Sequence, residues 1–420
     1  MKQHLARCID ETWALMDSIG RDTGGPGPGI TRPAFGEAEQ RGMEAVTAYA
    51  VAQGLEVRRD GFGNHHVLLP GREDLPAVAA GSHLDSVPNG GNFDGLAGCA
   101  AALAVVAAMH AAGVRPRRPI RVLLLRGEES PWFGTAYLGS RLLLGRSGWG
   151  EIGALVRRDS GRTLGEHLAA LGYDAGAGPV LEAGALACWF ELHIEQGPLL
   201  IDRDVPVGIG RACRGNIRFP DARCVGAYGH SAALPRDFRQ DAVLAVAELA
   251  LALDAFWAER TAAGDDNLVA TVGQFSTDPA QHAMTKVAGE VAFTLNLGAT
   301  EAETLAAVRD VLDTAVARIS RARRVVFELG AEVGTAPVPM DAGMMAMLEA
   351  SAAESGIGAT RIPTVGHDAA MFALAGIPAA VLLVRNQNGS HNPDETMTQA
   401  DFAAGTAVLA GAMLRAAEAA

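Results

Sequence analysis

Four separate stretches of the chain contain side chains that can bind metal ions or transfer protons. They supply three histidines, one isolated aspartate and a pair of adjacent glutamates. Imidazole and carboxylate ligands suit Zn²⁺, Mn²⁺, Co²⁺ or Ni²⁺. Each stretch follows a short apolar run that is typical of a buried strand. The four stretches read GSHLDSVPNGGNFDG, RGEESPWFG, ELHIEQGP and NGSHNPDE.

The first stretch contains a histidine and two aspartates. His83 comes directly after an apolar run, so we expect it at the carboxyl edge of a sheet, where open α/β sheets place their sites. Asp85 lies two residues further on, within reach of the second imidazole nitrogen. Asp94 follows a Gly/Asn/Pro loop that can turn tightly. The alternative is a set of solvated turn residues, since Asp and Asn are common in turns.

The second stretch contains two adjacent glutamates after the run IRVLLLR. Neighbouring carboxylates repel each other unless positive charge lies between them. A metal site explains the pair, with Glu129 as a ligand and Glu128 as the acceptor of a proton from water. The alternative is a helix N-terminus, where the macrodipole favours Glu.

The other two stretches each supply one histidine. His193 lies between two apolar residues in a strand, and His391 lies in a Gly/Asn/Pro loop after the run AAVLLV. A single histidine in such a strand is more often a hydrogen-bonded core residue than a ligand, and the alternative for His391 is a solvated loop. The conjunction of four such clusters instead indicates two metal ions about 3.5–4 Å apart, bridged by one carboxylate.

These residues require elements that bring them together. The apolar runs Ala77–Ser82, Ile120–Arg126 and Leu186–Ile194 predict strands, and the Ala-rich segment Leu96–Ala112 predicts a helix. Strand–helix–strand order indicates a parallel sheet covered by helices. Further on, Gly343–Ser355 and Asp401–Ala417 predict helices around a strand at Ala379–Val384.

The middle of the chain has a different order of expected strands and helices. We expect a β-α-β-β-α-β order, which is that of a ferredoxin-like domain. Residues 212–329 would then be inserted into a larger domain formed by 1–211 and 330–420. The expected strands lie near Ile217–Gly226, Leu268–Phe275, Val287–Leu297 and Arg324–Gly330, and the helices near Asp241–Ala258 and Glu301–Ser320.

The composition narrows the class of protein. Of 420 residues, 49% are hydrophobic and 20% are charged, and the formal net charge is −13. That balance is globular and argues against a nucleic-acid or anionic-membrane partner. The five cysteines show no CxxC spacing, which argues against disulfides and thiolate zinc sites. Without a signal peptide or membrane span, we expect a cytoplasmic enzyme.

Taken together, GSHLDSV…GGNFDG, EES, ELHIEQGP, GHSAALPRDFRQDA, GHDA and SHNPDE resemble the zinc-dependent amidases of the hydantoinase/carbamoylase type. These are the N-carbamoyl-L-amino-acid hydrolases and allantoate amidohydrolases, in the superfamily of carboxypeptidase-G2-like and aminoacylase-like metallopeptidases. The resemblance covers nearly the whole chain, with the motifs in order. It implies an α/β domain with a mixed, mostly parallel sheet and an inserted ferredoxin-like lid and dimerisation domain.

The resemblance also implies a role for each motif. Two divalent ions per subunit are expected, Zn²⁺ first with Mn²⁺, Co²⁺ or Ni²⁺ as alternatives, in a homodimer formed through the insert. Glu128 would be the general base, Asp85 would orient His83, and His230 would stabilise the oxyanion in the partner subunit's site. The expected metal ligands are His83, Asp94 and His193 for one ion and Asp94, Glu129 and His391 for the other. The expected substrate contacts are Gln196, His230, Asn216, Arg218, Arg239 and Gly389.

The motifs for substrate recognition depart from the family pattern. Amidases of this type have Asp-Ile-Arg on the fourth strand of the insert, where this chain has Asn296, Leu297 and Gly298. A glycine cannot replace a guanidinium that binds a carboxylate through two hydrogen bonds. Either the substrate has no such carboxylate, or Arg385, Arg218 or Lys286 binds it.

The sequence leaves three hypotheses about function. The first is a hydrolase of a C–N amide or ureido bond in a small molecule, such as an N-carbamoyl amino acid or an allantoate-like compound. The second is an N-acyl amino acid amidase or a dipeptidase. The third is a non-catalytic binding protein, which the intact set of ligands and acid–base residues disfavours.

Overall fold

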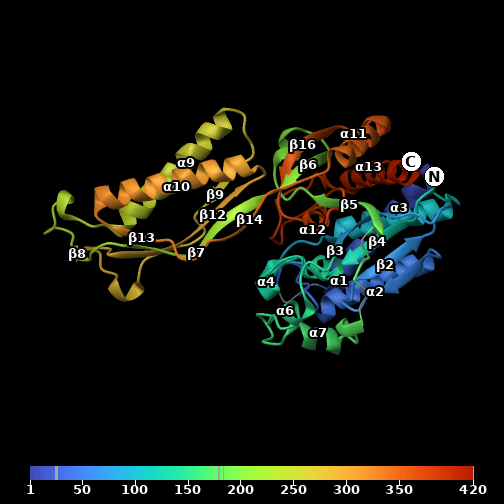
Figure 1. Ribbon diagram of the computed structural model, residues 1–420, viewed down its shortest axis with the longest axis horizontal. Helices are drawn as coiled ribbons and strands as arrows, with labels where there is room; N and C mark the ends of the chain where they lie inside the picture. The colour runs from blue at the N-terminus through green and yellow to red at the C-terminus, as the bar shows by residue number, and fades with distance from the viewer. Residues whose placement is uncertain (24–26, 178–179, 183, 420) are drawn as a thin grey trace. The chain divides into compact units, whose positions relative to one another are not determined.

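The computed structural model describes residues 1–23, 27–177, 180–182 and 184–419, which fold into two compact units (Figure 1). The smaller unit interrupts the larger one in sequence. We describe each unit by itself. The larger unit comprises Met1–Arg211, Met340–Ile362 and His367–Ala420, and the smaller unit comprises Ala212–Pro339 and Pro363–Gly366.

Most strands of a nine-stranded sheet form the core of the larger unit. Its strands are arranged in the order β1-β2-β4-β3-β5-β17-β6-β15, and β16 also pairs with β6. The strands are β1 (Glu56–Arg59), β2 (His65–Leu69), β3 (Ala77–His83), β4 (Ile120–Leu125), β5 (Leu186–Ile194), β6 (Val207–Cys213), β15 (Val338–Pro339), β16 (Ala359–Thr364) and β17 (Ala379–Val384).

The centre of this sheet is parallel, as the sequence predicted. β3 pairs in parallel with β4 and β5, and β5 pairs in parallel with β17. All residues of β3 and β17 are buried, which is typical of strands covered on both faces. The flanking pairs β2–β4 and β17–β6 are antiparallel. The sheet is therefore mixed and the larger unit is an α/β fold.

Helices cover this sheet. The alanine-rich α3 is buried along almost its whole length and contacts β3, α1 and α13. Small side chains permit this close packing of a helix between a sheet and other helices. The helices of the larger unit are α1 (Lys2–Thr23), α2 (Glu37–Ala52), α3 (Leu96–Ala111), α4 (Ser130–Phe133), α5 (Leu138–Leu143), α6 (Trp149–Ile152), α7 (Leu164–Ala170), α8 (Leu199–Asp202), α11 (Ala342–Ser355), α12 (Asp368–Leu374) and α13 (Gln399–Glu418), with a 3₁₀ turn η1 (Ala175–Ala177).

The smaller unit pairs a sheet with two long helices. The sheet has the order β10-β12-β7-β13, with β14 on β7 and β9 on β12, and β8 pairs with β11. Phe219, Phe293 and Leu312 are among the side chains of its own buried core. Its elements are β7 (Gly215–Val225), β8 (Gly229–His230), η2 (Arg236–Phe238), α9 (Ala242–Ala262), β9 (Val269–Thr271), β10 (Phe275–Ser276), η3 (Pro279–Gln281), β11 (Lys286–Val287), β12 (Glu290–Ala299), α10 (Ala302–Arg323), β13 (Val326–Glu328) and β14 (Val333–Thr335).

Two expected strands differ from the structure. The segment Leu268–Phe275 forms two short strands, β9 and β10, because the β7–β12 register shifts between Phe293 and Leu295. There the side chain of Thr294 accepts a hydrogen bond from the backbone N–H of Gln274 (3.0 Å). The expected strand near Val287–Leu297 is likewise divided into β11 and β12.

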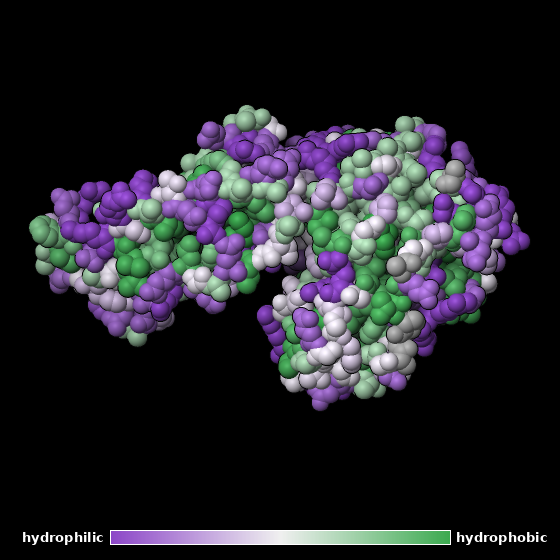
Figure 2. All heavy atoms as spheres, in the orientation of Figure 1, coloured by the Kyte–Doolittle hydropathy of each residue, from purple (hydrophilic) through white to green (hydrophobic). Residues whose placement is uncertain are grey.

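The surface of each unit is chemically mixed. The face seen in Figure 2 has hydrophilic residues interspersed with smaller apolar areas. Among the described residues, no helix is both long enough and apolar enough to cross a membrane.

Candidate metal centre

The parallel strands bring the predicted ligands to one edge of the large sheet. β3 ends at His83, β5 contains His193 next to its last residue, and Glu129 and His391 lie in the loops after β4 and β17. The carboxyl ends of parallel strands meet at the same edge of a sheet. Two groups of potential ligand atoms result, and within each group the atoms all lie within 4.8 Å of one another. The groups are His83, Asp94 and His193, and Asp94, Glu129 and His391.

Asp94 belongs to both groups, and its two oxygens face different partners. Its Oδ1 lies 3.1 Å from Nε2 of His193 and 3.5 Å from Nε2 of His83. Its Oδ2 lies 3.4 Å from Nε2 of His391, whose Nε2 is 3.5 Å from Oε1 of Glu129. Asp94 therefore has the geometry of a carboxylate that can bridge two ions.

Hydrogen bonds set the tautomers of the two buried histidines. Nδ1 of His83 lies 3.1 Å from the carbonyl oxygen of Asp85, and Nδ1 of His193 lies 3.0 Å from that of Ile194. A carbonyl oxygen only accepts, so in the neutral ring each Nδ1 bears the proton and each Nε2 carries a lone pair. Nε2 of His193 accepts a hydrogen bond from the backbone N–H of Gly95 (3.2 Å). Both Nε2 atoms face Oδ1 of Asp94.

The donor set fits divalent metal ions. Ligands about 2.0–2.1 Å from a tetrahedral ion lie about 3.3 Å from each other, close to the separations around Asp94. Four of the five ligand residues are buried, and His391 is exposed. Nitrogen and oxygen donors in this mixture suit Zn²⁺ or another first-row ion.

The electrostatics of the cluster also favour bound cations. Burial and the charge of Asp94 raise the pKa of Glu129 to about 8. Burial acts to lower the pKa of His83, but the hydrogen bond to Asp85 and the surrounding carboxylates raise it well above its usual value. The carboxylates and imidazoles therefore interact strongly through their charges, and a bound cation would stabilise the ionised form of Glu129.

Asp85 has a broader place in the site than the sequence predicted. Nδ1 of His83 lies 3.1 Å from the backbone carbonyl oxygen of Asp85 and 3.4 Å from its Oδ1, so both groups of Asp85 face the imidazole. The two carboxylate oxygens accept hydrogen bonds from the backbone N–H groups of Glu128 and Glu129 (3.1 and 3.0 Å). Asp85 thus connects the loop after β3 to the loop after β4.

Glu128 lies beside Glu129 in the loop after β4 and is partly buried. Burial raises its pKa well above the usual value, and the charge of His83 opposes that rise. A carboxylate with an elevated pKa can accept a proton and return it, which a fully ionised carboxylate does poorly.

The loops around the second group have unusual backbone conformations. Gln196 (φ 65°), Asn388 (φ 67°) and His391 (φ 59°) all lie in the left-handed region. Such conformations are uncommon outside glycine and gather at functional sites. Nε2 of Gln196 donates to Oδ2 of Asp94 (2.7 Å), so this predicted substrate contact already lies on the cluster. Gly389 (φ 68°) lies in the same loop as His391 and accepts a hydrogen bond from Asn386 (2.6 Å).

Two residues that sequence reasoning missed support Asp94 and its loop. Glu395 accepts hydrogen bonds from the backbone N–H groups of Phe93 and Asp94 (2.9 and 3.1 Å). The buried Arg32 donates from Nε to the carbonyl of Leu84 (2.7 Å) and from a terminal nitrogen to Oδ1 of Asn92 (2.8 Å). Glu395 lies within the motif SHNPDE and was open to prediction, whereas Arg32 is far away in sequence.

The remaining predicted contacts lie in the smaller unit. Asn216 and Arg218 on β7 pair with Gly298 and Asn296 on β12, and Nε of Arg218 donates to Oδ1 of Asn296 (2.9 Å). His230 is exposed on β8.

Two arginines that the sequence offers as substrate contacts already have partners. Arg239 donates to the backbone carbonyls of Ser231 and Leu234, so it holds the turn that follows His230. Arg385 forms ion pairs with Asp401 (2.9 Å) and Asp204 (3.0 Å). Arg385, one of the three cations that the sequence offers for a substrate carboxylate, therefore has its charge paired with two aspartates.

Comparisons with known proteins agree with this geometry. The family model of peptidase family M20/M25/M40 matches residues 79–415. An N-carbamoyl-L-amino acid amidohydrolase of Geobacillus stearothermophilus is 32% identical over 416 residues, 95% of this chain and 96% of that protein. The allantoate amidohydrolase of Escherichia coli is 27% identical and covers 98% of both chains.

A solved structure shares the whole fold. The hydantoinase/carbamoylase family amidase of Burkholderia multivorans superposes with a TM-score of 0.90 at 28% identity, over 98% of each chain. The match extends over nearly the full length of both chains. The chain belongs to peptidase family M20/M25/M40, in its hydantoinase/carbamoylase amidase branch.

Proposed function

We propose that the chain is a two-metal amidohydrolase that cleaves a C–N amide or ureido bond of a small molecule. One observation supports this most: two groups of potential ligand atoms share Asp94, and Glu128 lies beside the ligand Glu129. The family to which the chain belongs consists of hydrolases, and the amidases similar to it act on non-peptide C–N bonds.

Each ion would have its own set of ligands. His83, Asp94 and His193 would bind one ion, and Asp94, Glu129 and His391 would bind the other. Zn²⁺ is our first proposal. Mn²⁺, Co²⁺ and Ni²⁺ accept the same ligands and are the alternatives. Two bound ions would supply positive charge that polarises a carbonyl oxygen and makes water acidic enough to ionise near neutral pH.

The residues of the chain then perform the proton transfers. Glu128 would accept the proton of the attacking water and deliver it to the leaving nitrogen. Asp85 would hold Glu128 and Glu129 through their backbone N–H groups. Gln196, whose amide lies 2.7 Å from Asp94, would contact the substrate beside the cluster.

The substrate class follows from the relatives and from what this chain lacks. The relatives named above act on N-carbamoyl-L-amino acids and on allantoate. Gly298 stands where such amidases have a carboxylate-binding arginine, and a Cβ at Gly298 would already lie 2.9 Å from Val269. We therefore propose a ureido or amide substrate that is bound without an arginine at this position.

A substrate panel with defined metals tests this proposal. The purified protein, loaded with Zn²⁺ or Mn²⁺, is assayed on ureido, formyl, N-acyl and dipeptide compounds, each as a free carboxylate and as its amide. We expect turnover of ureido compounds, with only a small difference in activity between the free carboxylate and the amide of each compound. Activity confined to dipeptides or N-acyl amino acids would support the second hypothesis, and inactivity on every compound would contradict the proposal.

We also propose that residues 212–329 form a ferredoxin-like lid through which two chains dimerise. The element order β7-α9-β9-β12-α10-β13 supports the fold. Leu244 and Leu251, seven residues apart on α9, are 48% and 67% exposed, and exposed apolar residues along one helix mark protein contacts. His230, exposed on β8, would complete the site of the partner subunit.

A further inference from the structure

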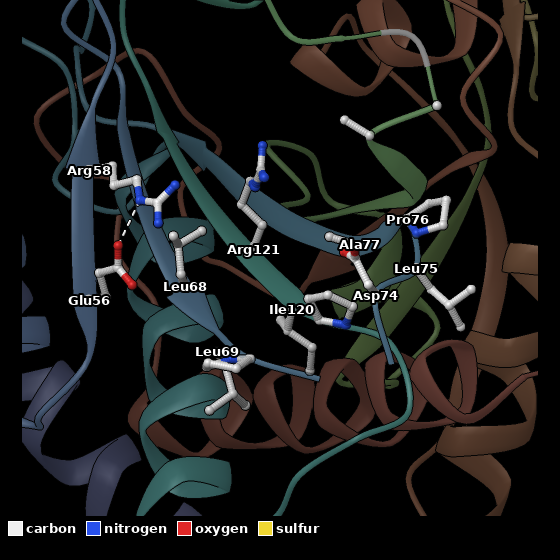
Figure 3. Close-up of a pocket in the computed structure, with 14 residues that line it drawn as sticks. Glu56, Arg58, Leu68, Leu69, Asp74, Leu75, Pro76, Ala77, Ile120 and Arg121 are labelled. Carbon is white, nitrogen blue, oxygen red and sulfur yellow. Dashed lines mark hydrogen bonds and ion pairs between the residues drawn. The ribbon is translucent and has the colours of Figure 1, made fainter. Parts of the chain in front are cut away.

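A cavity of about 480 Å³ lies in the larger unit, at the end of the sheet opposite the metal centre. Ala77 and Ile120, the first residues of β3 and β4, line it, whereas His83 and the Glu128–Glu129 pair follow the other ends of the same strands. Its volume is typical of sites for small molecules. Figure 3 shows the cavity with its lining side chains.

Cross-strand pairing brings charged and apolar side chains into one row. Glu56 on β1 pairs with Leu68 on β2, which pairs with Arg121 on β4. Directly paired residues point to the same face of a sheet, and Arg58 lies two residues from Glu56 on that face. In Figure 3, Leu68 accordingly lies between the side chains of Arg58 and Arg121.

The two arginines differ in how their charge is compensated. Arg58 is paired with Glu56 (2.7 Å), and both side chains are largely exposed. Nε of Arg121 is buried and has no hydrogen-bond partner among the residues that the structure describes. Burial and the neighbouring charge of Arg58 lower the pKa of Arg121. A buried guanidinium nitrogen without a partner is costly, so a bound anion would stabilise this arrangement.

The rest of the lining limits the kind of anion. Leu68, Leu75, Pro76 and Ile120 supply apolar surface, which suits a hydrocarbon chain. Asp74 and Glu56 also line the cavity and oppose a multiply charged ligand. We propose that this cavity is a second, non-catalytic binding site for a small organic monocarboxylate with an apolar chain. Arg121 binds the carboxylate, and the leucine and proline side chains bind the chain.

Calorimetric titration of the metal-loaded protein tests this assignment. The probe is 4-methylpentanoate, compared with its neutral amide and with inorganic phosphate. The wild type should bind the carboxylate at least tenfold more tightly than either comparison compound, because only the carboxylate combines one negative charge with an apolar chain. Equal affinity for the amide or for phosphate would overturn the assignment, as would no binding of 4-methylpentanoate.

Variants locate the binding. Arg121→Gln should weaken binding of 4-methylpentanoate at least tenfold, whereas Arg115→Gln, on the exposed loop before β4, should leave it unchanged. Leu75→Asp, outside the strands, places a negative charge at the lining and should also weaken binding at least tenfold, even if Arg121→Gln fails to fold. Unchanged binding in folded Arg121→Gln or in Leu75→Asp would contradict the proposal.

Discussion

Asp94 is the residue on which the proposed chemistry depends, because its two oxygens face different histidines. Oδ1 lies near His83 and His193, and Oδ2 lies near His391. His193 and other neighbouring histidines keep the pKa of Asp94 well below its usual value, although burial acts in the opposite direction. A carboxylate that stays ionised while buried can serve two cations.

Glu128→Gln separates metal binding from proton transfer. Gln has the size of Glu but cannot accept the proton of water, so we expect kcat to fall by about 10²-fold or more. The metal content should stay at the wild-type value, because Glu128 is not one of the grouped ligands. Steady-state kinetics and elemental analysis of the same preparation measure both, and near-normal kcat would show that another base acts.

His65, away from the metal centre, makes stability depend on pH. It is fully buried on β2, with Nδ1 near Thr47 (2.7 Å) and Nε2 near Tyr173 (2.9 Å). Burial, with the nearby Arg126, lowers its pKa to about 3. Because the unfolded chain binds the proton near pH 6.5, stability contributed by neutral His65 is present above that pH and is lost as pH falls toward 3.

The predicted loss between pH 6.5 and 5 is about 2 kcal/mol from His65. His65→Gln removes the titrating group, so its apparent Tm should fall less than that of the wild type between about pH 7.5 and pH 5. Thermal unfolding of the two proteins at both pH values measures the difference. Parallel Tm losses would show that His65 does not titrate in this way.

At the scale of elements, the site is a junction of loops that follow parallel strands. Asp85 after β3 binds the backbone of the loop after β4, and Glu395 after β17 binds the backbone at Asp94. Gly95, with φ 66°, lies so close to the His83 ring that a Cβ would lie 2.4 Å from it. The strands therefore place the loops, and these contacts fix the ligands.

Asp85→Asn tests the contact between two of these loops. The asparagine side chain has one acceptor oxygen where aspartate has two. One of the backbone N–H groups of Glu128 and Glu129 therefore loses its partner. Substitution of residues that hydrogen-bond to metal ligands lowers metal affinity by about 10–100-fold. Competition with a metal chelator measures that affinity, with the exposed Asp254→Asn as the matched control. Equal affinity in all three proteins would contradict the role of Asp85.

Patterns that are local in sequence predicted the site better than contacts between distant residues. His83 directly follows a predicted apolar strand and His193 lies within another, and the strands Leu186–Ile194 and Ala379–Val384 have the expected bounds. The pairing of Arg385 with Asp204 requires residues 181 positions apart, so no local pattern indicates it. The hydrogen bond from Arg32 to Asn92, which lies 60 positions further on, was missed for the same reason.

At the scale of the whole molecule, the proposed dimer predicts shared sites. His230 lies in the smaller unit and Glu128 in the larger unit, so each chain would supply a residue that its partner needs. His230→Ala and Glu128→Gln chains, each inactive alone, should together regain activity in mixed dimers. In an equal mixture half of all dimers are mixed, and each mixed dimer has one complete site of two, so activity near a quarter of the wild type is the upper expectation. Mixed dimers with no activity would contradict the shared site.

The metal content of the active protein tests the central claim most directly. Elemental analysis of wild-type protein after dialysis, paired with an activity assay, should give two divalent ions per chain, as the two groups around Asp94 predict. His391→Ala should retain one ion, because the group with His83 and His193 stays intact. Chelation should abolish activity, and Zn²⁺ or Mn²⁺ should restore it. Full activity in protein without stoichiometric metal would contradict the account.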